Sequence, residues 1–559
     1  MKRIVWWFLV LVLIFPLFYR LLNPGIHNIQ DSMQYFRVYE MGKCFSDGQF
    51  PCRWVPDLGY GFGYPLFLYY SPAPYYLGVF IHSLGFQYID TIKVLFILGF
   101  IVSALAMYEL CRYLFKNELA AVTAAVLYSY APVRAVQVYV RGSMGEFLSF
   151  IFFPWLFLFS YKIIKDHDRW SIIWLGLSAA GLLLTHNLMS LAFFPILGLW
   201  SLFWMYESRN VMAIKKLLVG VFIGIGLSAF FVIPLVFERQ YVHLETLVGG
   251  YFDYRQHFVD LFQLFISNHW GYGSSQLGPG DDLSLSVGQI HWFLWVVALI
   301  LAFINRKKRK QISLMIFVMS GVELLTLFLM HEKSSFIWKL VPGMSIFQFP
   351  WRFLVTSNFL LSFLAVSGIT LMGKKTQLMV IIITLVGLYI LHGSFFRPQK
   401  WMTITDNDLL HGEDFIKQQT SSIFDYLPMS SILPPNYPAK KIPEIMSGKA
   451  QVVSYFKGSD WQSGKISVIS NSVNVRVPIF DFPGMVVVVD GKEISHNHID
   501  CSGQAYCFGQ ISFKIPQGEH SFSVRLEKTW PRRWGDIISL VTLVGLGLVI
   551  IKSKIAYET

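Results

Sequence analysis

The chain contains few charged residues and few cysteines, and each shortage excludes a class of protein. Only 14% of its 559 residues are charged, whereas 54% are hydrophobic. This balance excludes a disordered or ordinary soluble chain and is typical of a protein with many membrane segments. The five cysteines do not have the spacing of zinc ligands. Internal repeats and low-complexity tracts are also missing from the sequence, which excludes a repeat protein.

The basic residues lie in short segments between long apolar runs. Short cytoplasmic loops of membrane proteins carry an excess of Lys and Arg, so we place these segments on the cytoplasmic side. The formal net charge of +12 therefore reports topology, and its spread over many loops argues against nucleic-acid binding. The segments contain Lys2 and Arg3; Arg112 and Lys116; Lys162, Lys165 and Arg169; Arg209, Lys215 and Lys216; Arg306 to Lys310; Lys374 and Lys375; and Lys552 and Lys554.

The apolar runs predict an α-helical polytopic membrane protein. A helix needs about 20 apolar residues to cross a bilayer, and about twelve runs approach this length. The first run follows Lys2 and Arg3 as in a signal peptide but lacks a small-residue cleavage site, so we expect it to be retained, with both termini in the cytoplasm. The predicted spans are residues 4–22, 91–111, 119–137, 147–164, 170–185, 188–206, 217–237, 289–305, 311–330, 353–372, 377–395 and 534–552.

This topology leaves three long segments outside the membrane. They are residues 23–90, 238–288 and 396–533. Near the end of the chain the long apolar runs give way to short alternating stretches, with Asp490-Gly491 as a hairpin signal. We therefore predict four parts: a multispan membrane domain at 1–396, an irregular extracytoplasmic linker at 397–449, a small all-β, sandwich-like extracytoplasmic domain at 450–530 and a final transmembrane helix at 534–552.

The cysteines follow the predicted sidedness. Cys44 and Cys52 lie in the first outside loop, Cys501 and Cys507 lie in the last one, and Cys111 lies at the cytoplasmic end of a span. An oxidising exterior permits disulfides outside only, so we predict the pairs Cys44–Cys52 and Cys501–Cys507. The alternative is four free thiols.

The first outside loop holds the most informative residues. Asp31 follows the first span closely, where a carboxylate can act as a general base or hold a divalent cation. Alternatively, Asp31 only caps a helix that follows it, because Asp is a favoured N-cap. Aromatic residues including Tyr64, Tyr69 and Tyr70 lie further along, broken by prolines. They are either interfacial anchors or a surface on which sugar rings stack.

Short motifs follow one another along the predicted outer side. They are Gly-Tyr-Gly-Phe-Gly-Tyr-Pro at 59–65, Arg141-Gly142 with Glu146, Thr185-His186-Asn187, Trp270-Gly271-Tyr272 with Asp281, Phe-Pro-Trp-Arg-Phe at 349–353, and Phe482-Pro483-Gly484. In order and sidedness they resemble bacterial multispan proteins of the GT-C glycosyltransferase superfamily. The closest resemblance is to the membrane proteins labelled 6-pyruvoyl-tetrahydropterin synthase-related, or YfhO-like. Members often have adjacent His and Asp, whereas His27 and Asp31 are separated here, which leaves the role of His27 open.

The resemblance implies a GT-C-like fold and a membrane glycosyltransferase. Such an enzyme moves a sugar from a polyprenyl-phosphate donor to an extracytoplasmic glycan or lipid acceptor, with inversion at the anomeric carbon. Asp31 would be the base, and Glu146 is the second catalytic candidate. Many relatives use a divalent cation, Mg²⁺ or Mn²⁺, and others do not. The protein would lie among the lipids of the bacterial cytoplasmic membrane, with its active face outside.

The donor phosphate requires cations, and Arg141 and Arg352 lie at the outer ends of spans. Arg matches phosphate oxygens well, although an Arg at this depth also contacts lipid head groups. Glu146 and His186 lie where ionisable groups face a cavity or a partner, so Glu146 is either functional or paired with Arg141 or Arg134. The predicted substrate-binding set is His27, Arg141, His186, Arg352, Tyr64, Tyr69 and Tyr70.

The sequence leaves the metal question and two other protein classes open. Asp281, Asp282 and the histidines of the 238–288 loop match no known ligand pattern. A non-catalytic membrane protein of a surface-glycan system is one alternative, and a lipid or glycan transporter is another. Transporters usually show paired halves and ionisable residues at mid-membrane, whereas the distinctive residues here lie at the predicted outer surface.

Overall fold

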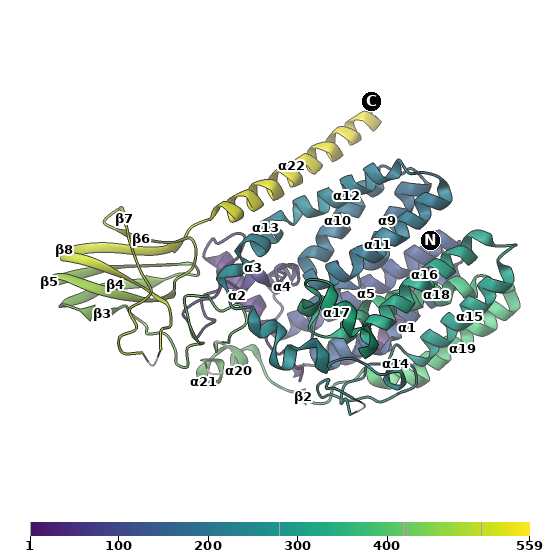
Figure 1. Cartoon of the computed structure of the whole chain (residues 1–559), viewed down its shortest axis with the longest axis horizontal. Coiled ribbons are helices and arrows are strands. Elements are labelled where there is room, and N and C mark those ends of the chain that lie inside the picture. Colours follow the sequence, from purple (N-terminus) through teal and green to yellow (C-terminus); the bar gives the residue numbers. More distant parts are fainter. Residues whose placement is uncertain (1, 279, 417–419, 422, 505, 559) are drawn as a thin grey trace. The chain divides into compact units, whose positions relative to one another are not determined.

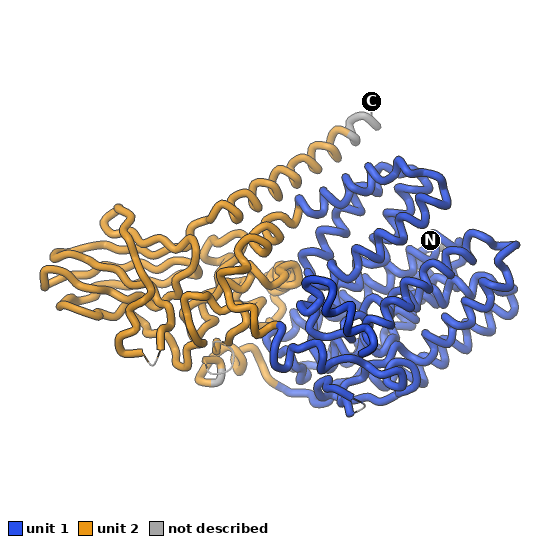
Figure 2. Tube along the Cα trace, viewed as in Figure 1, with its two compact units in different colours: residues 1–34, 89–226, 248–403 blue, residues 35–88, 227–247, 404–559 orange. Residues whose placement is uncertain are grey.

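The computed structural model describes residues 2–278, 280–416, 420–421, 423–504 and 506–558. The chain divides into two compact units, shown in Figure 2. Both are discontinuous in sequence: unit 1 comprises residues 1–34, 89–226 and 248–403, and unit 2 comprises residues 35–88, 227–247 and 404–559. The predicted first outside loop is therefore shared between the two units, with the division after Gln34.

Unit 1 is almost entirely helical (Figure 1). Its long apolar runs form helices because a helix pairs its backbone N–H and C=O groups internally. Helix α18 (Leu354–Ile369) is buried along its whole length. The other helices are α1 (Lys2–Ile14), α5 (Tyr88–Phe115), α6 (Glu118–Tyr130), α7 (Pro132–Ala135), α8 (Met144–Ser149), α9 (Phe152–Lys165), α10 (Trp170–Thr185), α11 (Asn187–Ser208), α12 (Ala213–Leu227), α14 (Leu261–Phe265), α15 (Gln289–Asn305), α16 (Lys310–Met330), α17 (Ser335–Leu340) and α19 (Lys374–His392).

Each of the twelve predicted spans contains an apolar helix or helix pair. Among the described residues, seven helices are long and apolar enough to cross a membrane, two segments are bent helix pairs and three are shorter apolar helices. The predicted helical, polytopic class is therefore confirmed. The seven are Tyr88–Phe115, Met144–Lys165, Asn187–Ser208, Lys310–Met330, Pro350–Ile369, Lys374–Phe395 and Trp530–Lys552.

The predicted span 119–137 is broken at Pro132. The helices on either side of the break are bent by 52°. Proline has no backbone N–H and disfavours a helical conformation in the residue before it. Accordingly, Ala131 is extended, with ψ 139°.

The chain beyond this break ends in a π-helical turn, Val136–Arg141. Gly142 follows with a left-handed φ of 66°, and a Cβ at this position would lie 2.4 Å from Ile29 Cδ1. The missing side chain lets the Asp31 loop approach the turn. The Gln30 N–H donates to the carbonyl of Val140 and the Asp31 N–H to that of Arg141, each at 2.9 Å. The loop after the first span is thereby fixed against the turn that carries Arg141.

Unit 2 contains shorter helices, a sheet and one long terminal helix. The terminal helix α22 (Trp530–Glu558) packs against α13 (Ala229–Glu238). The remaining helices are α2 (Gln34–Ser46), α3 (Leu66–Tyr69), α4 (Ala73–Ser83), α20 (Asp406–Leu410) and α21 (Gly412–Asp414).

The predicted all-β domain is present, but it is not a sandwich. Its strands form one six-stranded antiparallel sheet with the order β3-β5-β8-β6-β7, and β4 also pairs with β5. The sequence suggested more and shorter strands because polar breaks interrupt its alternation, yet β5 and β8 continue through these breaks with shifts in register. The strands are β3 (Glu444–Ser447), β4 (Ala450–Lys457), β5 (Trp461–Phe480), β6 (Met485–Val489), β7 (Lys492–Ile494) and β8 (Gln510–Leu526).

The hairpin predicted at Asp490-Gly491 is confirmed. These two residues connect β6 to β7, and Val489 pairs with Lys492. Both have positive φ, at 47° and 78°, as a two-residue hairpin turn requires.

Candidate functional site

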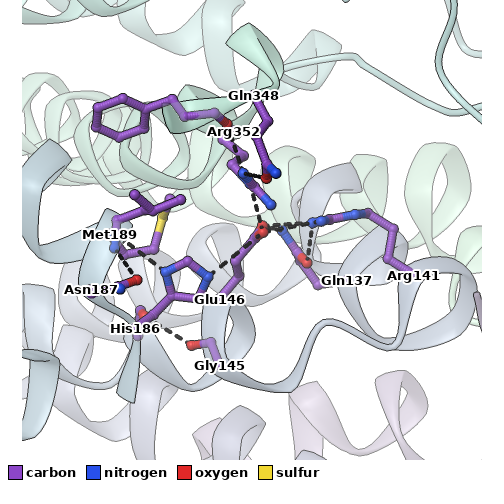
Figure 3. Close-up of polar contacts among 12 residues, drawn as sticks. Gln137, Arg141, Gly145, Glu146, His186, Asn187, Met189, Gln348 and Arg352 are labelled. Atoms are coloured by element: carbon purple, nitrogen blue, oxygen red, sulfur yellow. Dashed lines mark hydrogen bonds and ion pairs between the residues drawn. The ribbon is translucent and has the colours of Figure 1, made fainter. Parts of the chain in front are cut away.

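Glu146 is the centre of a buried polar cluster in unit 1, shown in Figure 3. Arg141 Nη1 donates to Glu146 Oε2 at 2.6 Å, and Arg141 Nη2 donates to Oε1 at 3.0 Å. Arg352 Nε donates to Oε1 at 2.9 Å, and Gln137 Nε2 donates to Oε2 at 2.7 Å. His186 Nε2 lies 3.9 Å from Oε1. Four residues that the sequence proposed separately, Arg141, Glu146, His186 and Arg352, therefore meet in one place.

The local backbone explains how these side chains reach one point. Gln137 and Arg141 both lie on the π-helical turn, and Gln137 Oε1 accepts a hydrogen bond of 2.9 Å from Arg141 Nη1. Glu146 lies in the first turn of α8. Next to it, Gly145 has no side chain, which allows a close approach to the 185–186 segment: a Cβ there would lie 2.7 Å from the Thr185 carbonyl oxygen.

His186 occupies the break between α10 and α11. Its Nδ1 accepts a hydrogen bond of 3.3 Å from the Met189 N–H and so caps α11. In the neutral ring the proton is then on Nε2, which faces Glu146. Burial lowers the pKa of His186 to about 4, so this ring is neutral at pH 7.

Two guanidinium groups share one carboxylate, and neutral His186 adds no charge. The side chain of Glu146 is 1% exposed, whereas those of Arg141 and Arg352 are 12% and 10% exposed. A partly accessible pair of arginines in an apolar environment attracts anions, and guanidinium groups bind phosphate or carboxylate oxygens in a bidentate manner.

Aromatic rings support both arginines. The Arg141 guanidinium lies 4.6 Å from the ring centroid of Trp351, and that of Arg352 lies 4.9 Å from Phe349. The two rings stack on each other with centroids 4.8 Å apart. All four residues except Arg141 come from the Phe-Pro-Trp-Arg segment at 349–352, so this motif supplies one arginine and the aromatic support for both.

Asp31 lies beside the cluster through its backbone contact with the Arg141 carbonyl. Its Oδ2 accepts a hydrogen bond of 2.8 Å from Gln34 Nε2, and the same amide also donates to the Gly142 carbonyl at 2.9 Å. Helix α2 begins at Gln34. Asp31 is half-buried, and the hydrogen bond from Gln34 orients its carboxylate, as a general base requires.

The contacts of Glu146 favour a role in orienting the arginines over the predicted catalytic role. Both of its carboxylate oxygens accept hydrogen bonds from arginines, and Oε2 also accepts one from Gln137. A carboxylate that is held in this way orients the two arginines and is poorly placed to take a proton from a substrate. Asp31 is the better candidate for the base.

His27 is a structural residue and not part of this cluster. Its Nε2 is 3.0 Å from the Val138 carbonyl, and its ring stacks on Trp401 with centroids 5.8 Å apart. It belongs to the short antiparallel pair β1 (Ile26–His27) and β2 (Trp401–Met402). Burial lowers the pKa of His27 to about 4, so it is neutral and packed in the interior.

The predicted sugar-stacking surface of tyrosines is wrong for Tyr64 and Tyr69. Both are buried within unit 2. Tyr64 donates to the Ile423 carbonyl at 2.8 Å, and Tyr69 donates to the Glu238 carbonyl at 2.8 Å. Tyr70 is half-buried beneath the Arg37 guanidinium, which lies 4.4 Å from its ring centroid. Residue type alone does not separate a buried tyrosine from an exposed one, because a phenol packs as well as it stacks.

The predicted disulfides are confirmed. Cys44 is bonded to Cys52 and Cys501 to Cys507, with Cα–Cα distances of 5.5 and 4.8 Å. Cys111 is free and buried.

The residues considered for a metal do not form a ligand set. Within the part of the chain that the structure describes, no three His, Cys, Asp or Glu side chains gather closely enough to hold a metal ion. Asp281 instead accepts hydrogen bonds from the Gln276 backbone and from Gln263 Nε2.

Sequence reasoning missed Gln137, Gln348 and Trp351. Gln137 is a polar residue four positions before Arg141 inside an apolar run, which is a weak signal for a shared helix face. Gln348 Oε1 accepts from Arg352 Nη1 at 2.6 Å, although it lies outside the recognised motif. Trp351 lies inside the motif, but its contact with Arg141 depends on a fold that brings the two segments together.

Comparison with known proteins gives a family and two partial similarities. Residues 67–397 match the family model described as 6-pyruvoyl-tetrahydropterin synthase related domain; membrane protein. The chain is 24% identical over 306 residues to an uncharacterized protein of Lactococcus lactis subsp. cremoris (strain MG1363), a match that covers 53% of this chain and about half (48%) of the relative. The crystal structure of the Archaeoglobus fulgidus oligosaccharyltransferase in the apo form is similar with a TM-score of 0.41 and 14% identity, over 71% of this chain and 56% of that one.

The family match includes most of the residues described above. Arg141, Glu146, His186 and Arg352 lie within the matched range, whereas Asp31 and the C-terminal sheet lie outside it. The match covers more than half of the 559 residues, and the apolar helices agree with it. The chain is a multi-pass membrane protein and belongs to the 6-pyruvoyl-tetrahydropterin synthase-related membrane protein family.

Proposed function

We propose that the protein is a membrane glycosyltransferase of the GT-C type. It moves a sugar from a polyprenyl-phosphate donor to an extracytoplasmic glycan or lipid acceptor. The observation that carries this proposal is the pair Arg141 and Arg352, which share Glu146 and are partly exposed. A lipid phosphate supplies the anion that such a pair binds.

The proposed reaction divides the chemistry between the arginines and Asp31. The acceptor hydroxyl oxygen attacks the anomeric carbon while Asp31 takes the hydroxyl proton. The bond from the anomeric carbon to the phosphate oxygen breaks, and the electron pair leaves with the phosphate. Arg141 and Arg352 stabilise the negative charge that develops on this leaving group. Attack from the face opposite the phosphate inverts the anomeric centre.

Glu146 makes this arrangement possible without taking part in proton transfer. The two guanidinium groups that bind Glu146 repel each other, and the carboxylate they share offsets that repulsion. Its hydrogen bonds with both arginines also fix their directions. The site is thereby organised before the donor arrives, which reduces the reorganisation that the reaction requires.

A deletion strain tests the proposed function. Loss of the protein should remove one sugar from a surface glycan or glycolipid, detected by mass spectrometry, and plasmid-borne wild-type protein should restore it. An unchanged glycan profile would contradict the proposal. A glycan that disappears but is restored by a variant without Asp31 carboxylate chemistry would instead favour a non-catalytic component of the glycan system or a transporter.

We also propose the bacterial cytoplasmic membrane as the location, with both termini in the cytoplasm and the Glu146 cluster facing outside. The basic segments between the spans support this orientation. A reporter fused at Lys308 should give a cytoplasmic signal, and one fused at Gly458 should give an external signal. The same side for both positions would overturn the orientation.

A further inference from the structure

A chain of hydrogen bonds connects the mid-chain loop of unit 1 to Trp351. The Trp351 indole N–H donates to Ser275 Oγ at 2.9 Å. Ser275 Oγ is also 2.8 Å from His257 Nδ1, and His257 Nε2 is 2.5 Å from the Tyr251 carbonyl. Trp351, Ser275 and His257 are all buried.

The chemistry of these groups fixes the direction of every bond in the chain. An indole nitrogen can only donate, and a carbonyl oxygen can only accept. Ser275 Oγ therefore accepts from Trp351, and its single proton is left to donate to His257 Nδ1. His257 must then carry its proton on Nε2, which donates to the Tyr251 carbonyl. These directions hold for neutral His257; a protonated ring would donate from Nδ1 to the second lone pair of Ser275 Oγ and leave the other two hydrogen bonds unchanged.

This series of hydrogen bonds ends at Trp351, beneath the Arg141 guanidinium. The Trp351 ring supports the Arg141 guanidinium at 4.6 Å and stacks on Phe349. Phe349 in turn packs against His257, with ring centroids 4.6 Å apart, and lies under Arg352 at 4.9 Å. His257 thus contacts the aromatic support of both arginines, by a hydrogen-bond route through Ser275 and by direct packing.

We propose that His257 and Ser275 are positioning residues that hold Trp351 beneath Arg141 and so set the affinity of the arginine pair for the donor phosphate. This inference rests on the proposed function. It assigns a role in donor binding to the loop at residues 251–275. Among the described residues, the hydrogen bonds to Glu146 come from other segments. The loop is then part of the donor site and not only its cover.

Two substitutions of His257 separate the two ends of its ring. Asn places an amide oxygen near the position of Nδ1, so His257→Asn keeps an acceptor for Ser275 and cannot be protonated. Gln reaches the position of Nε2, so His257→Gln keeps a donor for the Tyr251 carbonyl but removes the acceptor for Ser275. A merely structural role for His257 would not favour Asn over Gln.

The experiment measures the binding of polyprenyl phosphate to the full-length protein in nanodiscs. One neutral hydrogen bond is worth about 1 kcal/mol, so His257→Gln, Ser275→Ala and Trp351→Phe should each raise the dissociation constant about fivefold. The Ser275→Ala/Trp351→Phe double variant should show no further loss, because both changes break the same chain. His257→Asn should bind like the wild type at pH 7.

Additive losses in the double variant, or equal losses for the Asn and Gln variants, would overturn the positioning role. Unchanged affinity in Ser275→Ala and Trp351→Phe would also overturn it while the proposed function stands. A wild-type protein that binds no lipid phosphate would refute the proposed function, and the positioning role would fail with it.

Discussion

Two glutamates, one in each unit, form buried ion pairs with arginine, yet their surroundings differ. Glu238 at the end of α13 accepts from Arg532 Nε at 2.9 Å, and the two side chains are 2% and 1% exposed. Glu146 faces two arginines whose side chains are 12% and 10% exposed. The first pair is sealed from solvent, whereas the arginines of the second are partly exposed.

The difference shows how to distinguish a structural ion pair from a binding site. Arg532 lies in the first turn of α22, so its bond with Glu238 ties α13 to α22. Thr529 also donates to Glu238, and Phe482 lies 5.3 Å from the Arg532 guanidinium. This pair is sealed from solvent. Around Glu146 two arginines share one carboxylate and stay partly exposed, so we expect an incoming anion to reach them.

The largest expected effect comes from changing Asp31, the proposed base beside the Glu146 cluster. Asp31→Asn keeps the shape of the side chain and removes its ability to take a proton, so sugar transfer should fall by about 10²–10⁴. The measurement is transfer by membranes that contain equal amounts of inserted protein. Asp408→Asn is the matched control, since exposed Asp408 only accepts hydrogen bonds from Thr405, which Asn can also do. Wild-type transfer by Asp31→Asn would mean either that another residue is the base or that the protein is not a transferase of this type.

A second test removes the negative charge of each glutamate in turn. Glu238→Gln leaves Arg532 buried without a negative partner, so the free energy of unfolding should fall by about 3–5 kcal/mol. Glu146→Gln should destabilise less, because its arginines have some access to water, but it should alter phosphate binding. Thermal unfolding and lipid-phosphate binding of both variants in nanodiscs measure the contrast. If Glu238→Gln changed binding more than Glu146→Gln, the assignment of the two sites would be reversed.

The smallest of these three effects comes from replacing the planar guanidinium of Arg352 with the amine of lysine. Arg352→Lys keeps the charge but loses the planar fork that contacts Glu146, Gln348 and a phosphate at once. Polyprenyl phosphate should bind about tenfold more weakly, a loss of roughly 1.4 kcal/mol. Arg532→Lys is the matched change in the sealed pair and should leave binding unaltered. Equal weakening in both variants would indicate a general loss of structure.

Much of the fold followed from hydropathy and charge, but less of the site did. The twelve apolar runs correspond to helices because the length of an apolar run is fixed by the bilayer. The pairing of Cys44 with Cys52 followed from sidedness and short separation. The π-helical turn was not predicted, because its residues Val136–Arg141 read as the end of an apolar helix.

The cluster itself shows where local reasoning stops. Arg141 and Glu146 are close in sequence, so their contact could be anticipated. Arg352 lies 206 residues from Glu146, and only a resemblance to known proteins placed it on the same list of candidates. Tyr64 failed for the opposite reason: its neighbours in sequence suggested a surface, whereas its hydroxyl donates to a carbonyl 359 residues away.

The π-helical turn has a consequence for how the family can vary. A π turn contains one residue more than the α-helical path it replaces, and each residue rotates a helix by about 100°. Deleting a single residue between Val136 and Arg141 would therefore restore an ordinary helix that covers nearly the same total angle, so Arg141 would still point toward Glu146. Relatives that are one residue shorter in this segment are then expected to keep the Arg141 contact, so the length of the segment can vary by one residue without loss of the pair.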